Sequence, residues 1–415
     1  MSPAPTRDDC VTLDDEDPLR SYRDEFAIDD QALIYFDGNS LGRLPRETVE
    51  RVNHVLTREW GTRLIRSWQE SWLDLPTRIG DLIGTGLLGA EPGETVISDN
   101  TTVSLYKATA AALDARPDRS AVVIERDAFP TDRYIVESLA SQRALDIRWI
   151  DGVGPAGLTP GEVSAVLDES VAVALLSHVD YRSAAILDMA GVTAQVHEVG
   201  AIAIWDLCHS VGSVPIDLRG CRVDLAVGCS YKYLNGGPGA PAFTFVNRTA
   251  ASDLRQPIWG WWGRRDMFDM GPGYQPQGDV RSWLTGTPGV LSLAAVEPAI
   301  ELVVRAGIDR IRQKSIALTD LGVRLYDAWL ADLGMGLASP RDPARRGSHL
   351  TITHPAAARL VDQLTESGVI PDFRRPDGLR IGLSPLTTRF TDVYDGFATI
   401  GSLARSDGRG KERVR

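Results

Sequence analysis

Short runs of apolar residues recur through the middle of the chain and alternate with polar segments and segments of helical periodicity. The runs lie at residues 121–126, 171–178, 201–206, 223–230 and 240–246. Residues 188–200, between the second and third runs, have the apolar spacing of a helix that ends at a glycine. Nearly continuous apolar strands that alternate with helices are typical of a mostly parallel sheet covered on both faces. The pattern therefore predicts an α/β fold in which ligands bind at the carboxyl ends of the strands.

The pattern changes after about residue 292, where a long helical segment with an internal break begins. An apolar run at 349–354, a helix at about 356–367 and an apolar run at 379–385 follow it. This order predicts a smaller α+β domain. The expected divisions are an N-terminal arm and segment that pack on the small domain (1–55), a large domain (56–292), a small C-terminal domain (293–403) and a disordered tail (404–415).

The composition is that of an ordinary soluble protein and narrows the possible functions. The 415 residues are 43% hydrophobic and 24% charged, and the formal net charge of -12 disfavours general nucleic-acid binding. No apolar run has the length of a membrane helix and the N-terminus lacks a signal-peptide pattern, so we expect a cytoplasmic protein. The four cysteines, Cys10, Cys208, Cys221 and Cys229, have no metal-ligand spacing, which predicts reduced thiols and no metal site.

Lys232 stands in the stretch GCSYKYLNGGPG at residues 228–239, where no other side chain is ionised. It follows an apolar run, so we expect it at the end of a strand. Desolvation there would favour an uncharged amine that acts as a nucleophile or base. The alternative is a surface lysine whose side chain reaches solvent from a loop.

Asp206 also follows an apolar run, and its carboxylate needs a partner because an unpaired buried charge is costly. That partner is either an arginine or a protonated heterocyclic nitrogen. The chain between Asp206 and Lys232 is long enough for one helix and one strand, so both side chains are expected at the same edge of the sheet. A lysine that holds an aldehyde and a carboxylate that keeps a pyridinium protonated are the pair that a pyridoxal 5′-phosphate (PLP) enzyme needs.

Thr101 and Thr102 follow a short apolar run and begin a helical pattern. Backbone N–H groups and hydroxyls at a helix N-terminus bind anions, so these two threonines are candidates for a phosphate site. The alternative is that they only cap the helix.

Several segments resemble the kynureninase family, whose members are PLP enzymes of aminotransferase class V. They are YFDGNSLGRLP (35–45), RDAFPTDRY (126–134), WDLCHSVGSVPIDLRGCRVDLAVGCSYKYLNGGPGAPAF (205–243), GWWGRRDMFDM (260–270) with WLTGTPGVLSLAA (283–295), and GVIPDFRRPDGLRIGLSPL (368–386). They occur in the family's order, and the resemblance runs from about residue 12 to 400. It implies the fold type I architecture, with a large, mostly parallel, seven-stranded sheet domain that binds PLP and a smaller C-terminal α+β domain.

The resemblance implies roles for residues in these segments. Lys232 would bond covalently to PLP, Asp206 would pair with its pyridinium, and Tyr231 would lie at the phosphate and relay protons. The other cofactor-binding residues would be Thr101, Thr102, Phe129, Asp132, Ser177, His209, Trp261 and Thr287, the last reaching PLP from the second subunit of a homodimer with shared active sites. Arg380 would hold the substrate α-carboxylate with both arms of its guanidinium, with Asn39 nearby.

The activity that the resemblance implies is hydrolysis of the Cβ–Cγ bond of L-kynurenine, 3-hydroxykynurenine or both, as in tryptophan degradation. The products would be anthranilate or 3-hydroxyanthranilate, and L-alanine. The alternatives are a related enzyme that acts on a modified aryl amino acid in a biosynthetic pathway, and a class V aminotransferase. A nucleotide-binding module without enzymatic activity is disfavoured because the chain has no G-x-G-x-x-G or P-loop pattern.

Two positions depart from the family's pattern. Arg264 stands where the family usually has histidine, and Thr387 stands where it has an aromatic phenol. We expect both near the aryl end of the substrate, so they bear on which ring the protein accepts.

Overall fold

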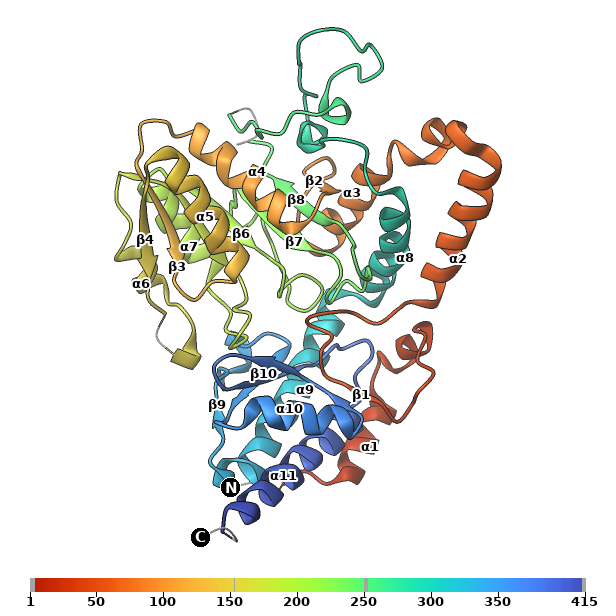
Figure 1. Cartoon of the computed structure of the whole chain (residues 1–415), viewed down its shortest axis with the longest axis vertical. Coiled ribbons are helices and arrows are strands. Elements are labelled where there is room, and N and C mark those ends of the chain that lie inside the picture. The colour runs from red at the N-terminus through yellow and green to blue at the C-terminus, as the bar shows by residue number, and fades with distance from the viewer. Residues whose placement is uncertain (1–3, 153, 250–252, 413–415) are drawn as a thin grey trace.

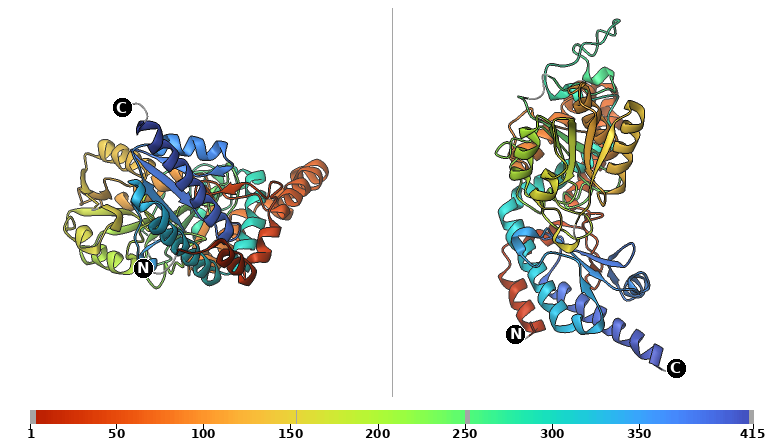
Figure 2. Two further views of the ribbon diagram at one scale, coloured as in Figure 1. Left: turned by 90° about the horizontal axis from the view of Figure 1, so that it is seen from below. Right: turned by 90° about the vertical axis from the view of Figure 1, so that its left-hand side faces the viewer.

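The computed structural model describes residues 4–152, 154–249 and 253–412, and it has two domains. In Figure 1 the large domain, built on a seven-stranded sheet, lies above the small domain, and both termini lie on the small domain. Figure 2 shows the same arrangement from two further directions. None of the helices in these described ranges is long and apolar enough to cross a membrane.

The large sheet has the strand order β2-β8-β7-β6-β5-β3-β4. Its strands are β2 (Thr95–Ser98), β3 (Ala121–Glu125), β4 (Asp146–Ile150), β5 (Val171–Ser177), β6 (Ile202–Asp206), β7 (Leu225–Cys229) and β8 (Ala242–Val246). Strand β8 is antiparallel to both of its neighbours, β2 and β7. The remaining neighbours in the order β7-β6-β5-β3-β4 all pair in parallel. The central strands are buried on both faces, which explains their nearly continuous apolar sequences.

Helices cover both faces of this sheet and form two hydrophobic cores. The helices of the large domain are α2 (Arg46–His54), α3 (Leu75–Leu87), α4 (Thr101–Asp114), α5 (Pro130–Arg143), α6 (Pro160–Ser164), α7 (Met189–Glu198) and α8 (Val290–Ala306). Alternate residues of a strand point to opposite faces, so Val122 packs with α4 and α5 while Val123 packs with α3, α7 and α8.

The small domain contains a four-stranded antiparallel sheet with the order β12-β13-β10-β9. Its elements are α9 (Ile308–Trp329), β9 (Gly336–Leu337), β10 (His349–Thr353), α10 (Ala357–Glu366), β12 (Asp372–Arg374), β13 (Gly378–Gly382) and α11 (Phe390–Glu412). Gly307, with a φ of 83°, separates α8 from α9 and is the predicted break in the long helical segment.

The N-terminal segment packs on the small domain. Helix α1 (Arg7–Glu16) has a capping box formed by Thr6 and Asp9 and lies along α11. The Asp14 carboxylate accepts hydrogen bonds from two backbone N–H groups at the start of α11. Strand β1 (Ile34–Tyr35) then pairs in parallel with β11 (Val369–Ile370).

The predicted apolar runs form strands, and the structure adds details that their pattern did not contain. Strand β4 lies at the edge of the large sheet and is only partly buried, so its sequence lacks a continuous apolar run. Helix α1 is held in place by its capping box and by its contacts with α11. Its mostly polar sequence has no apolar periodicity that would have predicted a helix. Helix α11 continues to Glu412, into the segment expected as a tail.

Glu125 ends β3 at the boundary between the domains, where it lines a cavity of about 250 Å³ together with residues of the hairpin between β12 and β13. Burial, reinforced by Asp180 and Asp127, raises the pKa of its carboxyl from 4.5 to about 8. The unfolded chain therefore loses this proton at a lower pH than the folded protein does. The conformational stability must decrease as the pH rises between these two values.

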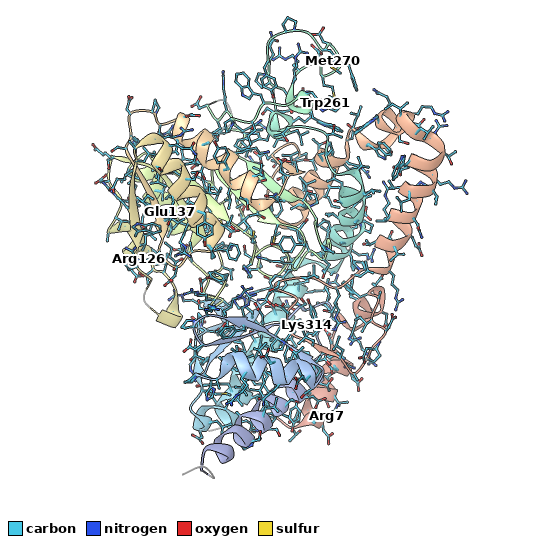
Figure 3. All side chains as sticks on the ribbon, viewed as in Figure 1. Arg7, Arg126, Glu137, Trp261, Met270 and Lys314 are labelled. Atoms are coloured by element: carbon cyan, nitrogen blue, oxygen red, sulfur yellow. The ribbon has the colours of Figure 1, made fainter. Side chains whose placement is uncertain are left out.

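We expect Glu125→Gln to remove this dependence of the free energy of unfolding on pH, because the amide has no proton to lose. The variant should also be more stable than the wild type at pH 7, by up to about 3 kcal/mol. Urea unfolding between pH 4.5 and 8 measures the effect. The matched control is Glu137→Gln, at an exposed position on α5 (Figure 3), which should leave the slope unchanged. An equal slope in the wild type and in Glu125→Gln would contradict the assignment.

Candidate active site

The carboxyl ends of β5, β6 and β7 bring three of the predicted residues to one edge of the large sheet. Ser177 and Asp206 are paired in register as the last residues of β5 and β6, and Asp206 is paired with Val227 of β7. Lys232 lies three residues beyond the end of β7 and is buried. The predicted edge that Asp206 and Lys232 share is therefore present.

The amine of Lys232 is enclosed by rings. Its Nζ lies 2.9 Å from His209 Nε2, and 5.7 and 5.8 Å from the ring centroids of Phe129 and Tyr231. Burial, and then the neighbouring charge of Lys232, lowers the pKa of His209 well below its usual value. A neutral His209 that accepts from the lysine at Nε2 carries its own proton on Nδ1, which has no partner in the described structure.

Asp206 and Asp132 form a buried carboxyl pair. Asp206 Oδ1 accepts a hydrogen bond of 2.8 Å from the backbone N–H of Cys208. Burial, and then the charge and hydrogen bond of Asp206, raises the pKa of Asp132 well above its usual value. This shift favours the protonated form of Asp132, which can donate a hydrogen bond to Asp206.

The N-terminus of α4 lies beside this pair. Its N-cap is Asn100, whose side chain accepts from the Val103 N–H at 3.0 Å. The capping role is thus filled, and the hydroxyls of Thr101 and Thr102 are not used for it. Thr101 Oγ1 lies 4.0 Å from the Sγ atom of Cys208, two residues beyond Asp206, so this helix N-terminus adjoins the carboxyl edge.

The loop before α4 is tied to the segment that precedes α8. Lys107, whose side chain is completely buried, donates to the Asp99 carboxylate and to the Trp283 carbonyl, both at 2.6 Å. The Thr285 hydroxyl donates to the same carboxylate at 3.2 Å. Thr287 follows two residues later and is exposed.

Trp261 lies in an aromatic cluster with Trp68 and Trp262. Figure 3 shows it at the end of the large domain that is opposite to the small domain. Among the described residues, neither Trp261 nor Thr287 makes a hydrogen bond or ring contact with Lys232 or His209. Their predicted roles at the phosphate therefore stay predictions.

The small domain supplies Arg380 and the N-terminal segment supplies Asn39. Arg380 is buried on β13, and its terminal nitrogens donate to the Tyr181 carbonyl at 2.9 Å and to Ser40 Oγ and Asp372 at 2.6 Å. Asn39 is completely buried, and neither of its side-chain polar atoms has a partner among the described residues.

These two residues are connected to the Lys232 site. Tyr181, to which Arg380 donates, packs edge-on against Phe129 at 5.3 Å between ring centroids. The backbone N–H of Gly42, in the loop that carries Asn39, donates to the Tyr231 carbonyl at 2.8 Å. The candidate substrate residues and the candidate cofactor residues therefore meet at the domain boundary.

Arg264 and Thr387 lie apart from each other. The Arg264 guanidinium bonds the Asp269 carboxylate and the Asp266 carbonyl, both at 2.8 Å, within a loop that projects from the large domain (Figure 1). Thr387 is buried in the small domain, and its carbonyl accepts from Arg23 Nε at 3.1 Å. Within one chain both positions support local structure.

His349 belongs to the site but was not singled out in the sequence. It is completely buried at the start of β10, and its ring centroid lies 5.6 Å from that of His209. The one available signal was a histidine at the head of the apolar run HLTITH. A histidine at such a position can also be an ordinary strand residue.

A cavity of about 810 Å³ lies elsewhere on the large domain, lined by residues around Arg248, Trp259 and Tyr274. It includes Val246, the end of antiparallel β8, and so lies at the opposite edge of the sheet from Lys232. It contains none of the predicted site residues.

Comparison with known proteins gives relatives that extend along almost the whole chain. Kynureninase from Pseudomonas fluorescens is 41% identical over 405 residues, which cover 96% of this chain and 95% of that protein. Kynureninase from Burkholderia pseudomallei strain 1106a is 42% identical over 405 residues, with the same coverage of 96% and 95%. A family model described as the kynureninase C-terminal domain matches residues 311–400.

Solved structures with low sequence identity share the fold. The apo cysteine desulfurase from Thermococcus onnurineus NA1 matches with a TM-score of 0.79 at 16% identity, over 93% of this chain and 98% of that chain. A C-DES mutant with glycine covalently linked to its PLP cofactor matches with a TM-score of 0.76 at 17% identity, over 96% and 99%. The predicted fold class is confirmed.

We expect Asp132→Asn to retain most of the stability because the amide still donates a hydrogen bond to Asp206. Asp132→Leu should cost roughly 1–3 kcal/mol, because it leaves the buried Asp206 without this donor. Urea unfolding at pH 7 compares the two variants. In the Glu125→Gln background, which removes the other carboxyl expected to be protonated at this pH, the infrared band of a protonated carboxylic acid should be present and should be lost when Asp132→Asn is added. Equal stabilities for the two variants would argue against the shared proton.

Proposed function

This chain belongs to the kynureninase family, and we propose that it binds PLP and hydrolyses the Cβ–Cγ bond of L-kynurenine or 3-hydroxykynurenine. The products are anthranilate or 3-hydroxyanthranilate, and L-alanine. Water supplies a hydroxyl to the acyl carbon and a hydrogen to Cβ, so the reaction is balanced. The observation that carries the proposal is the buried amine of Lys232 at the same sheet edge as Asp206.

The residues at this edge fit PLP. The cofactor supplies an aldehyde that bonds an amine and a protonated ring that delocalises electrons from the substrate's Cα. Lys232 is the buried amine, Asp206 is the carboxylate for the ring nitrogen, and Phe129 offers an aromatic face. The N-terminus of α4, with Thr101, adjoins them and suits a phosphate because its first N–H groups are free of helix hydrogen bonds.

Several neighbours support Asp206 and Lys232. Asp132, whose pKa is raised by burial and by Asp206, is suited to donate a hydrogen bond to Asp206, which leaves Asp206 as the acceptor for a ring N–H. Ser177, beside Asp206 in register, and His209, beside Lys232, complete the polar surroundings. The His209 ring positions the Lys232 amine through a hydrogen bond of 2.9 Å.

Lys232 and Tyr231 are the candidate residues for proton transfer in this site. The Lys232 amine would serve as the base for the proton on a substrate's Cα, because it is buried at the edge of the sheet where the substrate would bind. Burial, with Cys229 and Cys208, raises the pKa of Tyr231 above its usual value, so the phenol keeps its proton at neutral pH. Tyr231 is therefore suited to donate a proton rather than to act as a base.

The homodimer remains part of this proposal. Thr287 is exposed next to the segment tied to Asp99, which supports a role toward a partner subunit's site. Trp60 and Ile65, in the segment after α2, are 56% and 74% exposed. Exposed apolar side chains of this size are typical of subunit interfaces.

The competing activities differ in what they require. A desulfurase mechanism with a catalytic cysteine late in the chain is disfavoured, since no cysteine follows Cys229. Amino transfer requires a keto acid as acceptor and releases no alanine from kynurenine. An enzyme for a modified aryl amino acid shares the whole Lys232 site, so only its substrate distinguishes it.

We expect Lys232→Arg to abolish both turnover and the visible absorbance of the PLP-loaded protein, because a guanidinium does not bond the aldehyde. Lys314→Arg is the matched control, since Lys314 is also buried but pairs with Asp17 in the small domain. It should keep both properties. Full activity in Lys232→Arg would rule out its assigned role.

We expect the protein to convert L-kynurenine or 3-hydroxykynurenine to the aryl acid and L-alanine in equal amounts without added keto acid. Fluorescence of the aryl product and chromatography of alanine measure this. Amine transfer that depends on a keto acid would support the aminotransferase instead. Turnover only of other ring-modified substrates would support the biosynthetic alternative.

A further inference from the structure

One face of the small-domain sheet is turned toward the Lys232 site, and its register determines which side chains share it. His349 pairs with Gly382, and Thr351 pairs with Arg380, across β10 and β13. Residues two apart on a strand lie on the same face, so His349 and Arg380 are diagonal neighbours on one face, about 7–8 Å apart between backbones. Lys232 and Arg380 both contribute to the electrostatic surroundings of the His349 ring.

Gly382 leaves space on this face, and Asn39 fills it. A Cβ atom on Gly382 would lie only 1.9 Å from Asn39 Oδ1. Asn39 is therefore held directly over the strand position that opposes His349. The three side chains of Asn39, His349 and Arg380 gather around Gly382.

Arg380 by itself cannot satisfy a carboxylate fully. Its two terminal nitrogens make three hydrogen bonds, to Tyr181, Ser40 and Asp372, which leaves two of its five N–H donors, one on Nε and one on Nη1. A carboxylate has two oxygens, each of which accepts more than one hydrogen bond. Donors other than Arg380 are needed to satisfy it.

His349 and Asn39 have donors to spare. Both are completely buried, and in the described structure neither ring nitrogen of His349 and neither polar atom of the Asn39 side chain makes a hydrogen bond. Burial, and then the charges of Arg380 and Lys232, lowers the pKa of His349 well below its usual value. The Arg182 carbonyl acts in the opposite direction as an acceptor close to the ring, but it already accepts a hydrogen bond from the Thr351 hydroxyl, and neither ring nitrogen reaches it with hydrogen-bond geometry. A neutral imidazole has one N–H donor. Buried polar groups without partners are costly, so such a cluster points to a ligand.

We propose that His349 is a substrate-binding residue, whose imidazole N–H joins Arg380 Nε and the Asn39 amide in receiving the α-carboxylate of the amino-acid substrate. The inference rests on the proposed function for the class of substrate. It assigns to His349 selectivity for a ligand that carries a carboxylate at Cα. His349 contributes to substrate affinity more than to the chemical step.

The test compares His349→Leu and His349→Gln in the PLP-loaded protein. His349→Leu should raise KM for L-kynurenine about tenfold or more while kcat changes less than about threefold. His349→Gln keeps an N–H donor and should restore much of the affinity. The inhibition constant of kynuramine, which is kynurenine without its α-carboxylate, should be the same in all three proteins.

The matched control is His178→Leu. His178 is also buried and has an unpartnered Nδ1, but its ring packs edge-on against Trp205 at 6.2 Å. This variant should leave KM unchanged. Calorimetric binding of L-alanine provides a measurement that needs no turnover, and it should weaken in His349→Leu alone.

The outcomes separate the two proposals. An inactive wild type would overturn the proposed function, while the alanine titration would still decide the role of His349. If the wild type is active, and His349→Leu has the same KM and the same affinity for alanine as the wild type, then only this inference is overturned. Equal weakening of kynurenine and kynuramine would also overturn it, because the loss would then not involve the carboxylate.

Discussion

The hydrogen bond between Lys232 and His209 is the contact on which the rest of the site depends. It holds an amine away from water, between two aromatic rings, without placing it directly against a negative charge. The imidazole can do this because burial keeps it neutral. The nearby carboxyl of Asp132 has its pKa raised by burial and by Asp206, which favours its uncharged form and limits the negative charge in the same volume. The amine is thus held in a dry, largely aromatic setting.

The two domains surround this amine with two different sets of residues. The large domain supplies the strand ends and the helix N-terminus, which suit a planar anionic cofactor. The small domain and the N-terminal segment supply Arg380 and Asn39, which suit the polar end of an amino acid. Because Arg380 donates to the backbone of Tyr181, the two environments are joined by a direct hydrogen bond. Binding of an amino acid at Arg380 would therefore depend on how the two domains are positioned relative to each other.

The sequence predicted the shared edge of Asp206 and Lys232 because fully buried strands have uninterrupted apolar runs and end in polar residues. It could not identify His349, since that role depends on antiparallel register with Gly382, more than thirty residues away. The cap of α4 is a local feature that the sequence left open between neighbouring polar residues, and the structure shows that Asn100 and not a threonine is the cap. Local patterns predicted the elements, whereas long-range register decided which side chains meet.

The buried Lys107 has a consequence for assembly. Its hydrogen bonds join Asp99, just before α4, to the segment that carries Thr285 and Thr287. In a dimer of the proposed kind, Thr287 would reach the partner subunit's cofactor, so cofactor binding and subunit association would both involve the segment that this ion pair holds. Thermodynamic reciprocity would then require the cofactor to strengthen the dimer by the same factor by which the dimer strengthens cofactor binding. Dilution to the point where such a dimer dissociates would therefore also weaken cofactor binding.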